Sequence, residues 1–303
     1  RLAARMADYK RMSLSRAFSA LGWRRPGMAN TALLGLPALW FAGLYLAAIG
    51  ALLITSFWTV DDLSGNLIPG FSLVNFQQLF SGPVYIRIAL RTIGIAAAVT
   101  ITDVILAWPV AYAMIRLAGP RLRAAMMAAV MVPLWSSYLA RVYAWRLILS
   151  HNGLLNWALM EIGLPRAHIG YSNWAMWIVF SYLWLPFMIL PVAASVERIP
   201  PSLLEASADL GERGLATFRR VVLPMALPGM VAGAIFTFSL TLGDYVTPML
   251  VGGRGSDFIG NVVYSNVGVT NNIPFAAAYA VLPLGVMAVF LLIARKLGAF
   301  DAL

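Results

Sequence analysis

A long segment with no charged residue lies between Arg25 and Asp61, and it restricts the fold more than any other feature of the chain. A helix that crosses a lipid bilayer needs about twenty apolar residues, and this segment is long enough for one. Over all 303 residues, 61% are hydrophobic and only 11% are charged. A soluble domain carries roughly a quarter charged residues, so lipid must surround much of this chain. We therefore predict an all-α integral membrane protein.

Six apolar segments have the length and composition of transmembrane helices. Gly229 and Gly233 in the fifth segment form a small-xxx-small pattern, which lets two helices approach closely. Pro133, Pro186 and Pro191 lie inside the third and fourth segments, where we expect them to break the helices. The predicted spans are residues 31–58, 90–115, 124–148, 173–196, 225–246 and 275–294.

The distribution of basic residues predicts which side each connecting segment faces. If the N-terminus is inside, the inner segments are 1–30, 116–123, 197–224 and 295–303, and they hold 16 of the 22 Lys and Arg residues. Basic residues concentrate on the cytoplasmic side of membrane proteins, so both termini are predicted to be cytoplasmic. The net charge of +10 then indicates contact with anionic membrane lipid rather than with nucleic acid.

Motifs for catalysis are missing from the sequence. The chain has no cysteine and only two histidines, so we expect no metal site, and its only lysines, Lys10 and Lys296, lie outside any glycine-rich phosphate loop. These absences argue against an intramembrane enzyme and against ATP hydrolysis by this chain. A stand-alone secondary transporter or channel remains an alternative to a pump that draws its energy from another subunit.

The loop at residues 197–224 is longer and more patterned than a simple turn requires. The pair Pro200–Pro201 should end the preceding helix. Ser202 followed by Glu205 is a capping box, in which each side chain accepts a hydrogen bond from a backbone amide at the helix start. The pattern predicts a short helix at 203–210.

Beyond this short helix, Gly211 stands where a left-handed residue ends a helix. A second short helix is predicted at 215–222, ending before Pro224. An apolar ridge on the first helix offers a surface for a partner's groove, or else both helices dock at the lipid surface on the chain's own spans. The ridge consists of Leu203, Ala206 and Leu210.

The same loop resembles the EAA motif of ABC importer permeases. That motif reads Glu-Ala-Ala, three residues, Gly, nine residues, an aliphatic residue, any residue, then Leu-Pro, and this chain departs from it only at Ser207. The resemblance implies the type I importer permease (MetI-like) fold with six transmembrane helices, and a coupling helix that seats in a cleft of an ATPase subunit. The coupling positions that it implies are Glu205, Ala206, Ser207, Gly211, Leu223 and Pro224.

The resemblance covers roughly residues 33–296 and extends to spermidine/putrescine permeases. It rests on the stretches Pro133–Trp145, Asn152–Asn156, Trp184–Pro191 and Leu242–Pro248, the last followed by Gly252-Gly253. It implies polyamine import across a bacterial inner membrane, with an amino acid, an opine or an anion as alternative cargo. The implied partners are a second permease, two ATPase subunits that bind ATP and Mg²⁺, and a periplasmic substrate-binding protein, while this chain binds no cofactor.

With this resemblance the chain divides into five parts along its length. These are a basic cytoplasmic tail (1–30), a first transmembrane helix (31–60), a periplasmic segment (61–89), a permease core (90–296) with the coupling loop (197–224), and a cytoplasmic C-terminus (297–303).

Two acidic residues are predicted to lie at membrane depth, where an ionisable group faces a cavity or a partner. Asp103 falls in the second span and Asp244 near the outer end of the fifth. A polycation would be selected by carboxylates together with aromatic rings. Asp244 with Tyr245, and Asp103 with Trp135 or Tyr143, are therefore candidate cargo contacts. The alternative is an internal ion pair between either aspartate and Arg91, Arg141 or Arg146.

Overall fold

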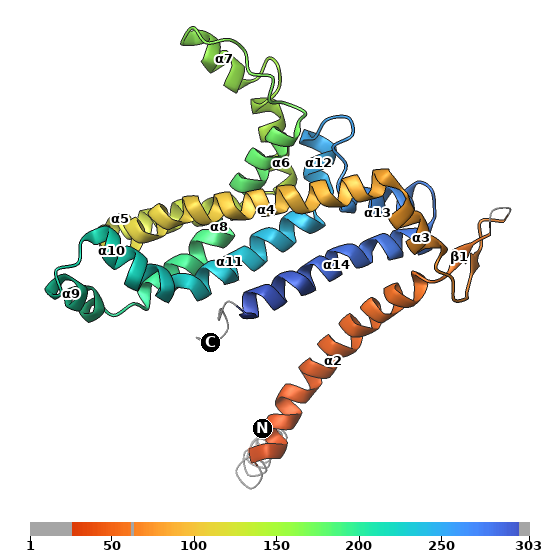
Figure 1. The fold of residues 1–303 in the computed structure, drawn as a ribbon, viewed down its shortest axis with the longest axis horizontal. Helices are drawn as coiled ribbons and strands as arrows, with labels where there is room; N and C mark the ends of the chain where they lie inside the picture. Colours follow the sequence, from red (N-terminus) through yellow and green to blue (C-terminus); the bar gives the residue numbers. More distant parts are fainter. Residues whose placement is uncertain (1–25, 62–63, 297–303) are drawn as a thin grey trace, which may run out of the picture. The chain divides into compact units, whose positions relative to one another are not determined.

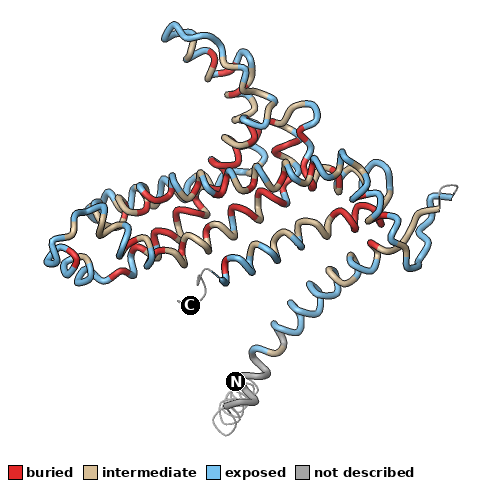
Figure 2. The backbone as a smooth tube through the Cα atoms, viewed as in Figure 1, coloured by how far each residue is buried: buried red, intermediate tan, exposed pale blue. Residues whose placement is uncertain are grey.

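The computed structural model describes residues 26–61 and 64–296 and divides them into two compact units, one ending at Thr55 and one beginning at Ser56. The predicted basic tail up to residue 25 and the C-terminal segment 297–303 lie outside the described residues. The first unit is helix α2 (Pro26–Thr55). Its segment Pro37–Thr55 is long and apolar enough to cross a membrane, and none of it is buried (Figure 2). A helix that exposes apolar side chains on all sides is suited to lipid.

The second unit contains four further helices of membrane-spanning length (Figure 1). Three of them match the predicted spans within a few residues, whereas α4 begins well before residue 90. Pro83 explains the early start, because proline is favoured in the first turn of a helix. The long helices are α4 (Pro83–Tyr112), which continues into the π-helical turn η1 (Ala113–Leu117), α8 (Asn173–Glu197), α11 (Leu223–Gly243) and α14 (Ile273–Lys296).

The third predicted span is a bent pair of helices rather than one straight helix. It consists of α5 (Pro120–Trp135) and α6 (Tyr138–Ile148), which are bent by 96° relative to each other. The bend lies at Ser136 and Ser137, whose ψ angles of 154° and 133° are extended. The described chain therefore has five spanning helices, or six if this bent pair counts as one span.

The expected helix breaks at the internal prolines are wrong. Pro133 lies inside α5, and Pro186 and Pro191 lie inside α8, which continues unbroken to Glu197. The helix instead ends just before the pair Pro200–Pro201, as predicted. A proline removes one backbone hydrogen bond, but neighbouring helices in a membrane protein can hold such a helix together.

Helices α4, α8 and α11 pack against one another to form the core (Figure 1). Gly229 and Gly233 lie on α11 where it meets α8, and an added Cβ at Gly229 would come within 2.4 Å of the Pro191 carbonyl oxygen. At Gly233 it would come within 3.0 Å of the Met188 Cα. The predicted close approach of two helices through this glycine pair is confirmed.

Several short elements that the sequence did not predict lie around the spanning helices. A two-stranded antiparallel hairpin pairs Thr59 with Ile68 and Val60 with Leu67. The side-chain amide of the buried Asn75 donates hydrogen bonds to the carbonyl oxygens of Ser56 and Trp58, just before the first strand of this hairpin. The elements are β1 (Thr59–Val60), β2 (Leu67–Ile68), α3 (Val74–Ser81), α7 (Leu154–Glu161), α12 (Val246–Val251) and α13 (Ile259–Gly268).

Candidate functional sites

The first candidate site is the α8–α11 loop, residues 198–222, which contains α9 (Pro201–Asp209), α10 (Gly214–Thr217) and the π-helical turn η2 (Phe218–Val222). The predicted capping box is wrong, since no side chain caps the start of α9. Pro200 occupies the N-cap position and Pro201 the first helical turn, which places Ser202 inside the helix. The fixed φ of proline favours this earlier start.

Gly211 ends α9 in the left-handed conformation, with a φ of 76°, as predicted. Its amide donates to the carbonyl of Ala208 at 2.9 Å, and the Glu212 amide donates to the carbonyl of Ser207 at 3.1 Å. This pair of bonds is the Schellman arrangement, which satisfies carbonyls that the helix end leaves free. The chain therefore turns sharply at Gly211.

The second predicted short helix does not stop before Pro224. Helical structure runs without interruption from Gly214 to Gly243, through α10, η2 and α11. The π-helical turn ends at Val222, two residues before Pro224, and its wider hydrogen-bonding pattern accommodates a residue that lacks an amide hydrogen. The loop is therefore joined rigidly to a core helix.

The predicted apolar ridge on α9 is exposed. Leu203 and Leu210 are 41% and 84% exposed, and Ala206 and Glu205 are exposed as well. The half-buried Leu204 packs instead against the core cluster between α4, α8 and α11. The ridge does not dock on the chain's own helices and is open to a partner.

Arginines from the η1–α5 segment hold the end of α8, where the loop begins. Arg116 donates to the carbonyls of Val196 and Ile199 at 2.8 and 2.6 Å, which satisfies carbonyls at the helix end. Arg123 forms an ion pair with Glu197 at 2.6 Å. One side of the loop is thus anchored to the same helices that form the core.

The second candidate site surrounds Asp244, the first residue after α11. Its Oδ1 accepts hydrogen bonds from the amides of Val246 and Thr247, the first two residues of α12, at 2.7 and 3.1 Å. Its Oδ2 accepts from the hydroxyls of Thr247 and of Tyr138 on α6. The residue is only 9% exposed. All its donors are neutral, so they stabilise the carboxylate without cancelling its charge.

Asp244 borders a cavity of about 360 Å³, which is lined chiefly by aromatic and apolar side chains. The rings of Tyr138 and Trp184 stack with centroids 5.9 Å apart on one side. Tyr245 also lines the cavity and stacks on Tyr264 at 4.8 Å. We name this site the Asp244 cleft, lined by Tyr138, Trp184, Ser239, Leu240, Gly243, Asp244, Tyr245 and Val246.

The alternative of an internal ion pair is wrong for both aspartates. In the part of the chain that the structure describes, neither Asp103 nor Asp244 forms an ion pair with any of the three arginines. Arg146 instead lies over the rings of Tyr143 and Tyr171, at 5.9 and 5.8 Å. The arginines considered were Arg91, Arg141 and Arg146.

Asp103 lies on α4 and has no exposed surface. Neither of its carboxylate oxygens has a hydrogen-bond partner among the described residues, so the structure does not join it to Trp135 or Tyr143. Trp135 ends α5 and is 82% exposed, and Tyr143 is 47% exposed. A buried carboxylate without a partner is unfavourable at membrane depth. Contact between Asp103 and cargo therefore requires another conformation of the bundle.

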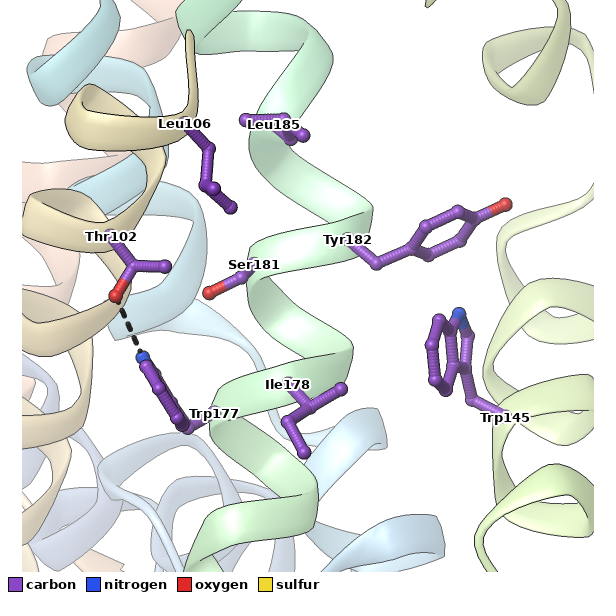
Figure 3. Close-up of a pocket in the computed structure, with 8 residues that line it drawn as sticks. All are labelled: Thr102, Leu106, Trp145, Trp177, Ile178, Ser181, Tyr182 and Leu185. Atoms are coloured by element: carbon purple, nitrogen blue, oxygen red, sulfur yellow. Dashed lines mark hydrogen bonds between the residues drawn. The ribbon is translucent and has the colours of Figure 1, made fainter. Parts of the chain in front are cut away.

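A second cavity of about 360 Å³ lies between α4, α6 and α8 (Figure 3). Trp177 donates to the hydroxyl of Thr102 at 3.0 Å, while Trp145 of α6 faces Tyr182 of α8. The buried hydroxyl of Ser181 has no hydrogen-bond partner in the described chain. The walls are otherwise apolar, which suits a hydrocarbon chain better than an ion.

Sequence reasoning missed Tyr138 and Trp184 as members of the Asp244 cleft, and Thr247 as a hydrogen-bond partner of Asp244. Tyr138 and Asp244 are 106 residues apart, so no local pattern connects them. The sequence signal that could have found them was their position inside the stretches that carry the family resemblance.

Comparisons with known proteins agree with this architecture. The chain matches the family described as "binding-protein-dependent transport system inner membrane component" over residues 27–298. It is 45% identical to the inner membrane ABC transporter permease protein YdcU of Escherichia coli (strain K12), over 94% of this chain and 95% of that protein.

Two further similarities concern cargo and fold. The spermidine/putrescine transport system permease protein PotB of Escherichia coli (strain K12) is 32% identical, over 79% of this chain and 86% of that protein. A crystal structure of a bacterial ABC transporter that imports alginate superposes with a TM-score of 0.72 at 20% identity, covering 90% of this chain and 96% of that chain. This second likeness supports the fold alone. With a family match over most of its length and helices that fit it, the chain belongs to the inner membrane permease subunits of ABC importers.

Proposed function

We propose that this permease carries polyamines and that the Asp244 cleft contacts them. The observation that carries the proposal is a carboxylate held only by neutral donors beside a cavity with aromatic walls. No cation of the described chain neutralises such a carboxylate, so it can pair with an ammonium group, and the rings of Tyr138, Trp184 and Tyr245 add cation–π attraction. The similarity to PotB, whose name gives spermidine and putrescine as its cargo, supports the same cargo class.

A second cargo class is favoured by one observation. Arg141 lies one helical turn from Tyr138 on α6, and its Nε and Nη1 are buried without a partner among the described residues. An unpaired guanidinium close to the cleft would attract an anionic solute and repel a polycation. Competition of uptake by putrescine, spermidine and small dicarboxylates in the reconstituted transporter distinguishes the two classes.

We further propose that the exposed face of α9 docks on an ATPase subunit that binds ATP and Mg²⁺. The complete transporter would contain a second permease, two such ATPases and a periplasmic substrate-binding protein. Both termini and the α8–α11 loop would face the cytoplasm, which agrees with the surplus of basic residues predicted on that side. The exposure of Glu205, Ala206 and Leu210 on a short, anchored helix supports this docking.

The cargo proposal is tested by Asp244→Asn. The asparagine oxygen can still accept the two backbone hydrogen bonds from the start of α12, so the fold is retained while the charge is lost. A hydrogen bond to a charged group contributes about 1.5–3 kcal/mol, so the KM for polyamine uptake should rise about ten- to hundredfold. Asp257→Asn removes the same charge from an exposed loop position and should change nothing. Wild-type kinetics in Asp244→Asn would remove this residue from the pathway.

The docking proposal is tested by Glu205→Arg. Reversing this exposed charge should lower co-purification of the ATPase severalfold, because like charges across an interface are unfavourable, while membrane insertion stays normal. Glu161→Arg makes the same change at an exposed site on α7 and serves as the control. Undiminished co-purification of Glu205→Arg would contradict the docking role.

A further inference from the structure

The feature that carries the inference is a pair of hydroxyl groups inside the α8–α11 loop. Ser207 is the only buried residue of α9, with 7% of its surface exposed. Its Oγ lies 2.9 Å from the Oγ1 of Thr217, the last residue of α10, and either oxygen can be the donor. Ser207 is also the position at which this chain departs from the Glu-Ala-Ala pattern. Alanine there could not form this bond.

The attachment of α9 to the rest of the loop is otherwise slight. Leu203, Ala206 and Leu210 are exposed, and the half-buried Leu204 packs against the core cluster between α4, α8 and α11. The helix is bounded by the proline pair at its start and by the left-handed Gly211 at its end. Both boundaries set a direction for the chain without adding side-chain contacts.

Thr217, in contrast, belongs to a long rigid element. It lies near the start of the continuous helical segment Gly214–Gly243, which at 1.5 Å per residue is about 45 Å long. Phe218, the next residue, packs edge-on against Trp108 of α4 at 5.0 Å. The far end of the segment leads directly into Asp244.

A second contact supports the same geometry. Glu212, just after the turn at Gly211, forms an ion pair with Arg220 of η2. Arg220 is largely exposed, and exposed ion pairs contribute little to stability. The buried hydroxyl pair is therefore the stronger of these two polar links between the first part of the loop and the helical segment that leads to the cleft.

We propose that Ser207 and Thr217 are positioning residues that clamp α9 to α10 and α11, so that a displacement of α9 is transmitted to the Asp244 cleft. The inference rests on the proposed docking of α9 on an ATPase. Without the bond, α9 can rotate about Gly211 and Pro200 while α11 stays still. A hydrogen bond between neutral groups contributes about 0.5–1.5 kcal/mol, which corresponds to about a two- to tenfold change in the population of the clamped loop.

The test uses the complete transporter with variants that alter only the hydroxyl pair. Thr217→Val and Ser207→Ala each remove the bond with little change in volume, and Thr217→Ser retains it. Ser202→Ala removes an exposed hydroxyl from the same helix and is the matched control. The first measurement is the number of ATP molecules hydrolysed per putrescine or spermidine taken up in proteoliposomes.

The second measurement does not depend on the cargo. This chain contains no cysteine, so spin labels can be placed at Ala208→Cys on α9 and Met225→Cys on α11, both at exposed positions, with the other subunits made cysteine-free. The distance between the labels is recorded with and without ATP. A clamped loop gives one narrow distance distribution in both states.

We expect Thr217→Val and Ser207→Ala to broaden this distribution and to raise the ATP consumed per cargo molecule about two- to tenfold, with unchanged co-purification of the ATPase. Thr217→Ser and Ser202→Ala should behave as wild type. A wild-type distance distribution in either bond-removing variant overturns the clamp, whether or not α9 docks on the ATPase. Normal co-purification of Glu205→Arg would overturn the docking and leave the distance measurement valid.

Discussion

The contact between α8 and α11 yields a prediction whose magnitude follows from the structure. In Gly229→Ala, the new Cβ would lie 2.4 Å from the Pro191 carbonyl oxygen and 2.2 Å from the Ser195 Oγ. The serine side chain can move, but the carbonyl belongs to the backbone of α8. A separation of at least about 3.0 Å is needed, so the two helices must part by about 0.6 Å. Such a gap forfeits about a quarter of the dispersion attraction between contacting atoms.

Forcing an extra methyl group into a packed interface costs about 1–3 kcal/mol. Alanine also has a higher helix propensity than glycine, by about 1 kcal/mol, which partly hides this cost. Gly285→Ala on α14 is the matched control, because an added Cβ there meets nothing within 4 Å and the propensity gain is the same. We therefore expect the free energy of unfolding of Gly229→Ala to be about 1–3 kcal/mol below that of Gly285→Ala.

The assay is equilibrium unfolding of the purified permease in mixed micelles of increasing denaturing-detergent content, followed by tryptophan fluorescence and helical circular dichroism. Both variants are compared with wild type under the same conditions. Equal stability of Gly229→Ala and Gly285→Ala would refute the argument that these backbones are in close contact.

Two further predictions concern single residues that organise loops. Gly211→Val places a β-branched residue at a φ of 76°, which costs about 1–2 kcal/mol, and should increase proteolysis between α9 and α10 relative to the control Gly214→Val, whose φ is not positive. Asn156→Ala removes a buried side chain that forms hydrogen bonds with the backbone of Ser150, His151 and Ala167. Local opening of this segment should become about tenfold more frequent. Amide hydrogen exchange over residues 150–168 should then be faster, while α8 stays protected. Unaltered proteolysis in the first variant, or unaltered exchange in the second, would contradict the respective role.

Features that depend on one residue and its chain neighbours were predictable from the sequence. Gly211 was recognised because a helix end with a left-handed residue favours glycine strongly. The glycine pair on α11 was recognised for a similar reason, since small residues at this spacing permit contact between helices. Hydropathy alone located the long helices, because a bilayer demands a minimum apolar length.

Features that depend on competing local signals or on contacts between distant residues were not predictable from the sequence. Ser202 and Glu205 form a valid capping pattern, yet the helix starts two positions earlier than this pattern predicts, at Pro201. The bend between α5 and α6 arises from two extended serines that hydropathy does not register. The bond from Tyr138 to Asp244 joins residues 106 positions apart, so only the folded chain brings them together.

The π-helical turn η2 determines how α9, before the turn, is rotated relative to Asp244 at the far end of α11. A π-turn contains one residue more than an α-helical turn would need, and Leu223 accordingly donates to Phe218, five residues back. Removing one residue from Phe218–Val222 would restore the ordinary helical pitch and rotate everything before it by about 100° relative to α11. The angular phase between the exposed face of α9 and the carboxylate of Asp244 is therefore set by a single inserted residue.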